Sequence, residues 1–316
     1  MYSRQQKFSV FRLLATVALC LVLVVGSGCS NKALPIKGDN PTEVDFTSGL
    51  SDYPYIDSDT QDNPENPGLT DFPDTSHTPD IPVTPGAPDT TKPRALTAAD
   101  VLALPARTVI SPEQAAGLNF SECFVSFAIS DEVFARINGK SFVENPHISI
   151  WELRYLKVLH YNYDHQIQVG ELIVNASLAT EFLDIFLELF NLEYEIYSMY
   201  LVDDIWTGDP LTTDDVSCEL NNTSAFSYRI VPETGNLSKH AVGKAIDINP
   251  LQNPYVEYYG GAPWVLDPNS APYIDRSAGH AHMITYTDDC YKVFAKRGYF
   301  WGGDWWGIKD YQHFEK

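Results

Sequence analysis

Two histidines and two aspartates in the carboxy-terminal part of the chain have the types and spacing of a zinc site with a base beside it. Six residues separate His240 from Asp247, and His313 follows far downstream, three residues after Asp310. A catalytic zinc ion typically takes three protein ligands from His, Asp or Glu and keeps one position for water, whose proton a nearby carboxylate can accept. Asp310 and His313 are close enough in sequence to face one centre from a single turn. The pattern predicts one Zn²⁺ held by His240, Asp247 and His313, with Asp310 as general base.

The local sequence suggests how the first two ligands meet. Residues 245–248 alternate as a strand does, and Gly243 permits a turn that folds His240 back toward Asp247. One such pair is a weak signal by itself, because a hydrogen-bonded surface histidine and a turn or cap carboxylate give the same spacing.

Other polar residues offer competing interpretations. His280 and His282 could form an alternative metal pair on one face of a strand, although no carboxylate cluster stands beside them in the sequence. Asp304 is a candidate for orienting a metal ligand, whereas His160 and His165 fit packing and a turn. Four aromatic residues could line a substrate groove or equally form core and rim: Tyr255, Tyr258, Tyr259 and Trp264.

Net charge and cysteine spacing exclude two other classes of function. The chain of 316 residues has a formal charge of -21 and no clustered basic face, so we expect no nucleic-acid binding. No two cysteines have the close spacing of a Cys-rich zinc site. If Cys29 becomes the mature amino terminus, at most one disulfide can form within the chain. The five cysteines are Cys20, Cys29, Cys123, Cys218 and Cys290.

Residues 1–29 are typical of an export signal. Basic residues precede the apolar run Leu13–Val25, which is short for a membrane span of about 20 residues. The small residues before Cys29 predict lipoprotein processing, with lipid on that cysteine; an ordinary signal peptide or an uncleaved anchor would serve the same export. We expect an extracytoplasmic protein, anchored to the cell membrane through Cys29 and facing the cell wall.

Residues 30–95 predict a disordered linker. Eleven prolines fall between Asn31 and Pro93, among many Asp, Thr and Ser residues. Such a segment cannot bury enough apolar surface to offset its chain entropy, and its prolines favour extended conformations. It would let a membrane-bound catalyst reach into a surrounding matrix.

Residues 96–316 predict one folded domain of the α+β class, because strand and helix patterns mix without strict alternation. The helix over 178–190 has one apolar face and a candidate cap at Ser177, and the helix over 287–297 begins at a candidate cap, Thr287, and stops at Gly298. The expected strands are Cys123–Ile129, a hairpin of Leu153–Tyr163 and Gln166–Asn175 with Asp164 and His165 at its turn, and Ile196–Val202.

Several separated motifs resemble the M15 family of zinc peptidases. They are Ser238-x-His240-x2-Gly243-x-Ala245-x-Asp247, Trp301-Gly-Gly-Asp-Trp305 and Asp310-x-x-His313-Phe314, with Leu153–Leu156, Val169–Val174 and Asn222–Arg229 upstream. The resemblance runs from about Asp131 to Lys316. It implies a small antiparallel sheet with flanking helices, as in hedgehog and D-Ala-D-Ala peptidases, and the same three zinc ligands. Asp310 aligns with the family's general base, and Arg229 with an arginine that contacts substrate near the scissile carbonyl.

The resemblance implies hydrolysis of peptidoglycan stem peptides; we expect the protein to be a monomer. The family contains D-alanyl-D-alanine carboxypeptidases and L-alanyl-D-glutamate endopeptidases, and the carboxy-terminal motifs favour the endopeptidases slightly. The alternative is a non-catalytic cell-wall-binding lipoprotein with a structural zinc ion or none, which would have no use for a base at Asp310.

Overall fold

The computed structural model describes residues 93–231 and 235–316, which all fall in one compact unit, Ile81–Lys316. The expected export signal and all but the last three residues of the expected linker lie outside the described residues. Within the described ranges no helix is both long enough and apolar enough to cross a bilayer.

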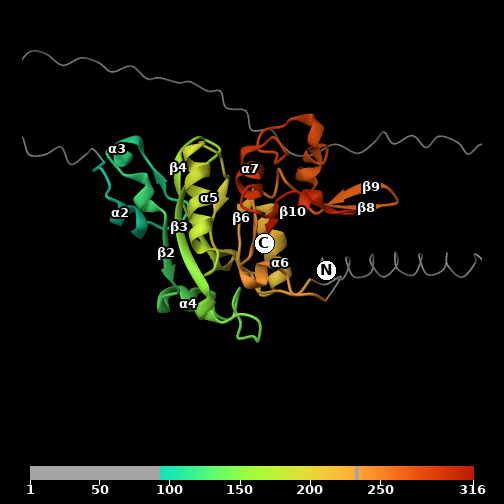
Figure 1. The fold of residues 1–316 in the computed structure, drawn as a ribbon, viewed down its shortest axis with the longest axis horizontal. Coiled ribbons are helices and arrows are strands. Elements are labelled where there is room, and N and C mark those ends of the chain that lie inside the picture. The colour runs from blue at the N-terminus through green and yellow to red at the C-terminus, as the bar shows by residue number, and fades with distance from the viewer. Residues whose placement is uncertain (1–92, 232–234) are drawn as a thin grey trace, which may run out of the picture. The chain divides into compact units, whose positions relative to one another are not determined.

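A four-stranded antiparallel sheet forms the amino-terminal part of this unit (Figure 1). Its central hairpin pairs β3 with β4 over nine residues each, from Leu153↔Asn175 to Tyr161↔Ile167. The hairpin was predicted and is confirmed, including its turn, where His165 has a φ of +57°. The sheet order is β1-β4-β3-β2, with β1 at Val109–Ile110, β2 at Val125–Ala128, β3 at Leu153–Tyr161 and β4 at Ile167–Asn175.

Helix α5, Ala179–Asn191, lies between this sheet and the carboxy-terminal elements (Figure 1). Its apolar side chains recur at helical spacing and are buried, as the sequence predicts. The predicted cap is wrong: the Ser177 hydroxyl donates to Asn175 Oδ1 (2.7 Å) instead of capping the helix. The buried face consists of Ala179, Phe182, Ile185, Phe186, Leu189 and Phe190.

Short helices surround the sheet, and several begin at side-chain caps. Thr97, Ser111 and Ser130 each accept a hydrogen bond from a backbone N–H in the first turn. These elements are α2 at Ala98–Ala103, α3 at Pro112–Ala115 and α4 at Asp131–Ile137, with 3₁₀ turns η1 at Phe120–Cys123 and η2 at Ile150–Glu152.

The carboxy-terminal part is built from much shorter strands in three small sheets. Two are antiparallel, in the orders β10-β12-β7 and β11-β8-β9, and β5 pairs with β6 in parallel. The strands are β5 Ser198–Met199, β6 Asn222–Thr223, β7 Ala245–Asp247, β8 Tyr255–Tyr259, β9 Ala262–Val265, β10 Phe300–Trp301, β11 Lys309–Asp310 and β12 His313–Glu315. The helices are α6 Pro210–Glu219 and α7 Asp289–Ala295, with 3₁₀ turns η3 Val202–Ile205, η4 His240–Val242, η5 Pro268–Tyr273, η6 Arg276–Ala278 and η7 Gly302–Asp304.

The mixed α+β class is therefore confirmed, while several element boundaries differ from prediction: the strand expected at 123–129 spans only 125–128, and the helix expected over 287–297 ends at Ala295. The strand expected at 196–202 is only two residues long, because the Asn222 side chain takes over both backbone groups of Tyr200 (3.0 Å each) and ends the ladder. Helix α7 starts two residues late because Asp288, not Thr287, accepts from the Cys290 N–H (2.8 Å).

One hydrophobic cluster joins both parts. It runs from β3 and β4 through α5 to Phe294 and Phe314, whose rings stack at 4.4 Å. The three cysteines in the described ranges are unpaired thiols, so no disulfide contributes there: Cys123, Cys218 and Cys290.

Candidate metal centre

Two ligands of the predicted zinc site face each other across a pair of short strands. In the β7–β12 ladder His313 pairs with Asp247 and Phe314 with Ile246. Side chains alternate along a strand, so Ile246 and Phe314 point into the core, where both are fully buried, while Asp247 and His313 share the opposite face. The alternation predicted for residues 245–248 therefore places Asp247 on the face of the ladder that carries His313.

The third ligand reaches them through a tight turn. His240 opens η4, which ends at Gly243 with a φ of +65°. A Cβ on Gly243 would lie 2.6 Å from the backbone nitrogen of Asn175, so both conformation and space require glycine. The turn is tied to the end of β4, because Asn175 donates from its backbone to the Gly243 carbonyl (2.8 Å) and from its side chain to Val242 (2.9 Å).

The three side chains converge as the sequence predicts. His313 Nδ1 lies 3.1 Å from His240 Nε2 and 3.0 Å from Asp247 Oδ1, and His240 Nε2 lies 3.3 Å from Asp247 Oδ2. A tetrahedral ion ~2.0–2.1 Å from each ligand needs ~3.3 Å between ligand atoms. All three residues are buried, and they are the one group of three or more His, Cys, Asp or Glu side chains in the described part of the chain that could hold a metal ion. The donor set and its spacing fit zinc.

Hydrogen bonds to the outer ring nitrogens fix which nitrogen of each histidine faces the centre. His240 Nδ1 lies 2.5 Å from the Ala225 carbonyl, and His313 Nε2 lies 3.2 Å from Glu315 Oε2. Both partners accept, so each outer nitrogen carries a proton, and in the neutral ring the inner nitrogen has a lone pair for a metal. Sequence reasoning missed both partners. Glu315 had a signal, since it stands two residues after His313 on a strand and so shares its face.

The charges of the group favour a cation. Burial opposes ionisation of Asp247, yet the two imidazoles hold the pKa of this carboxyl well below its usual range. Burial likewise opposes protonation of His313, but hydrogen bonds to Asp247 and Glu315 raise its pKa to about 10. The pocket thus stabilises positive charge in the space between the three side chains.

Asp310 lies on β11, beside these candidate ligands, with a carboxylate oxygen that has no partner among the described residues. The residue is 8% exposed, and its Oδ1 is buried without a hydrogen bond to any described group. Burial raises the pKa of Asp310 to about 7, a rise that His313 opposes and Asp247 reinforces. Gly302 makes room for it, since a Cβ there would lie 2.8 Å from that of Asp310. A buried acid with this pKa can accept or release a proton at neutral pH.

Arg229 lies at the edge of the site and forms an ion pair. Its Nη2 is 3.0 Å from Asp214 Oδ2 on α6, and its side chain is 11% exposed. It is near enough to Asp310 for its charge to lower the pKa of that carboxyl. Sequence reasoning identified Arg229 but not Asp214.

The alternative histidine pair is wrong. His280 and His282 do not lie on a strand; His282 has a φ of +63° and stacks on Tyr163 with ring centroids 3.7 Å apart. His160 is buried, and His165 occupies the hairpin turn, as predicted.

Asp304 hydrogen-bonds to neither candidate histidine ligand, and the four aromatic residues predicted for a groove lie at different places. Asp304 is exposed and accepts a hydrogen bond from Tyr286 (2.6 Å), while the two histidine ligands are oriented by other groups. The aromatic ring against the centre is Trp305, 5.2 Å from His313. Of the predicted groove residues, Tyr255 pairs with Asp310 along the β8–β11 ladder, Tyr258 and Tyr259 are exposed on the β8–β9 hairpin, and Trp264 contacts Tyr259.

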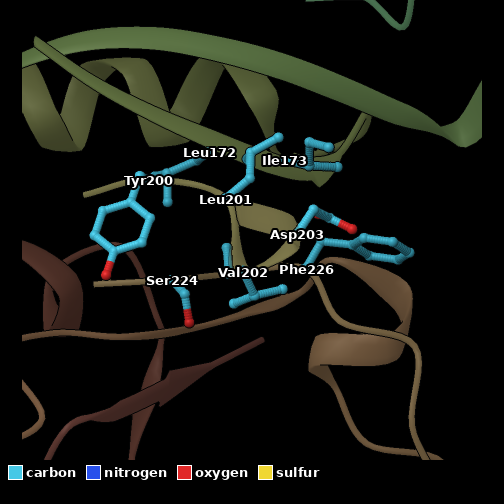
Figure 2. A pocket seen from close by; sticks show the side chains of 9 residues that line it. Leu172, Ile173, Tyr200, Leu201, Val202, Asp203, Ser224 and Phe226 are labelled. Carbon is cyan, nitrogen blue, oxygen red and sulfur yellow. The ribbon is translucent and has the colours of Figure 1, made fainter. Parts of the chain in front are cut away.

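A small apolar cavity lies along the segment Ser224–Phe226, whose Ala225 carbonyl contacts His240 (Figure 2). Leu172, Val202 and Phe226 are among its lining side chains, and the segment Ser224–Phe226 passes along it. Asp203 adds one carboxylate, which already accepts from the Ser141 N–H and hydroxyl (3.1 and 2.8 Å). The cavity contains none of the metal-site side chains, so it is a packing feature next to the centre.

Comparison with known proteins finds a match over the segment that contains the candidate metal site. Residues 232–316 match a family model described as D-alanyl-D-alanine carboxypeptidase, of the M15 peptidases. No curated protein and no solved structure matches the chain. The match includes all three ligands and Asp310; Arg229 and the motifs upstream of it lie outside. A peptidase family domain supports a hydrolase that acts on peptide bonds. By this match and by the buried group of His240, Asp247 and His313, residues 232–316 are similar to peptidases of the M15 family.

Proposed function

We propose that this chain is a zinc-dependent peptidase that hydrolyses the stem peptides of peptidoglycan. The observation that carries the proposal is the buried His240–Asp247–His313 group with the unpartnered oxygen of Asp310 beside it. A site that only held a structural ion would have no need for a buried base without a partner.

The proposed reaction assigns separate roles to the three zinc ligands, to Asp310 and to Arg229. Zinc held by His240, Asp247 and His313 would supply a Lewis acid that lowers the pKa of a water molecule toward ~7. Asp310 accepts the proton of the attacking water and passes it to the leaving amine as the peptide C–N bond breaks. Arg229 donates to the carbonyl oxygen as negative charge develops there.

The substrate follows from the family and from the expected location. The bond cut is either L-Ala–D-Glu within the stem peptide or the terminal D-Ala–D-Ala bond. Digestion of purified muropeptides followed by mass spectrometry separates the two, because the first releases the peptide that begins at D-Glu and the second a single D-alanine.

We also propose that the protein acts outside the cytoplasm, held to the cell membrane by lipid on Cys29 and facing the wall. Support comes from the sequence of residues 1–29 and from the substrate. Incorporation of labelled lipid into the wild type but not into Cys29→Ser tests this part separately from catalysis.

The first prediction separates metal binding from proton transfer. We expect Asp310→Ala to keep one zinc per chain and lose about 10²–10⁴ in turnover, the usual contribution of a general base. We expect His240→Ala to lose both zinc and activity. Asp184→Ala, on the exposed face of α5, is the matched control and keeps both.

Two results would contradict the proposal. Full activity in Asp310→Ala would remove the base assignment. A zinc-loaded wild type that binds muropeptides without cutting them would favour the alternative, a cell-wall-binding lipoprotein.

A further inference from the structure

Two side chains of helix α6 contact residues at the candidate site, and neither has a role in the proposed mechanism. Asp214 and Cys218 stand four residues apart on it and so share one face. Cys218 Sγ lies 3.7 Å from the Gln312 side chain, directly before His313, and Asp214 reaches Arg229. One helix face therefore contacts the ligand strand at one point and the arginine at another.

We propose that Asp214 is a positioning residue that holds Arg229 at the scissile carbonyl; this rests on the proposed peptidase function. Asp214 acts through the arginine and does not touch the substrate itself.

Arg229 is held at its backbone and at the guanidinium end of its side chain. Its backbone carbonyl accepts from the Ser238 N–H (3.2 Å), and the Ser238 hydroxyl accepts from the His240 N–H (3.2 Å). The main chain of Arg229 is thus tied to the turn that carries a metal ligand. Asp214 supplies the anchor for the guanidinium end, and α6 is itself fixed by its Asp209 cap, which accepts from two N–H groups (3.1 and 2.9 Å).

The charges around the arginine explain why an anchor is needed. The Arg229 side chain is only 11% exposed, so water screens it poorly and it requires an anion. Asp214 raises the pKa of Asp310 and Arg229 lowers it, so the charge of each acts on the base. Without Asp214, the guanidinium would turn to Asp310 and occupy the carboxylate that has to accept the proton of water.

The first test is a double-mutant cycle on muropeptide hydrolysis. Asp214→Asn should lower kcat by about 10-fold, part of the 10²–10³ that loss of a charge-stabilising donor costs, with KM nearly unchanged. Asp214→Glu should restore part of the loss. In an Arg229→Ala background, Asp214→Asn should have no further effect, because the partner through which it acts is gone. Full additivity of the two losses would overturn the proposal, as would a zinc content reduced by Asp214→Asn.

A second measurement does not depend on activity. The guanidinium N–H signals of Arg229, assigned in side-chain NMR of the full chain by their loss in Arg229→Lys, should show restricted rotation in the wild type. Asp214→Asn should release that restriction and Asp214→Glu should keep it. Equal mobility in wild type and Asp214→Asn would overturn the positioning role. If the zinc-loaded wild type cuts no muropeptide while the NMR contrast holds, the peptidase proposal fails and the anchoring of Arg229 stands.

Discussion

The amino-terminal sheet and the metal centre are held together in different ways. Strands β3 and β4 pair over nine residues each, whereas β7 and β12 pair over three. A long ladder fixes its register by many repeated contacts, but a three-residue ladder cannot. The geometry of the candidate metal centre therefore depends on single side-chain contacts, each of which holds one segment in position.

Arg276 illustrates such a contact. Its guanidinium donates to the carbonyls of Gln252, Tyr273 and Ile284 and to Asn253 Oδ1, at 2.6 to 2.9 Å. It also lies over the ring of Tyr311, 4.5 Å from its centroid, in the turn between Asp310 and His313. One side chain thus joins segments that no ladder connects.

The largest effect should follow from breaking the junction between the two regions. Gly243→Ala places a side chain against the end of β4 in a left-handed conformation. The conformation costs about 1–2 kcal/mol and the overpacking about 1–3 kcal/mol, so the free energy of unfolding should fall by about 2–5 kcal/mol. Thermal unfolding of the metal-free protein measures it, at about 2–4 °C per kcal/mol.

Gly279→Ala is the matched control for this variant. Its φ of +68° is almost that of Gly243, but nothing lies within 4 Å of the added Cβ. It should show the conformational cost alone. Equal losses in the two variants would mean that the contact between β4 and the His240 turn contributes nothing.

The same difference explains what the sequence could predict. The β3–β4 hairpin and α5 follow from periodicity, which repeats over many residues. The group of His240, Asp247 and His313, with Asp310 beside it, follows from residue type and spacing. Asp214 and the Ala225 carbonyl enter the site through tertiary contacts, and the side chain of Asn222 ends β5 through another, so no local pattern predicts them. Glu315 differs, because it stands two residues after His313 on the same strand and shares its face.

A buried histidine in the amino-terminal sheet and a buried aspartate at the start of α7 make stability depend on pH in opposite directions. Burial lowers the pKa of His160 in β3 to about 4, and burial raises the pKa of Asp288 at the start of α7 to about 6. The unfolded chain protonates His160 from about pH 6.5 downward, so stability from this group is lost as pH falls from 6.5 to 4. The folded chain holds a proton on Asp288 between about pH 3.8 and 6, so that stability is lost as pH rises through 6.

Two substitutions test these opposite signs in chelator-treated protein. His160→Gln should reduce the loss of stability on acidification, and Asp288→Asn, which keeps a capping side chain, should reduce the loss between pH 4 and 7. Each effect is at most about 3 kcal/mol, from 1.36 kcal/mol per pKa unit. Profiles parallel to the wild type would show that the group in question titrates alike in both states.

The smallest effect should fall on metal affinity. Glu315→Ala removes the acceptor that orients His313, and loss of such a partner typically weakens metal binding about 10–100-fold, or about 1.4–2.7 kcal/mol. Zinc titration against a competing chelator measures it, with Glu132→Ala on the exposed start of α4 as control. Glu315→Gln should lie between wild type and alanine, because it keeps an acceptor but not the charge. If Glu315→Ala binds zinc as tightly as the wild type, the ring of His313 is held by Trp305 and the β7–β12 ladder alone, and the centre depends less on single polar contacts than its short strands suggest.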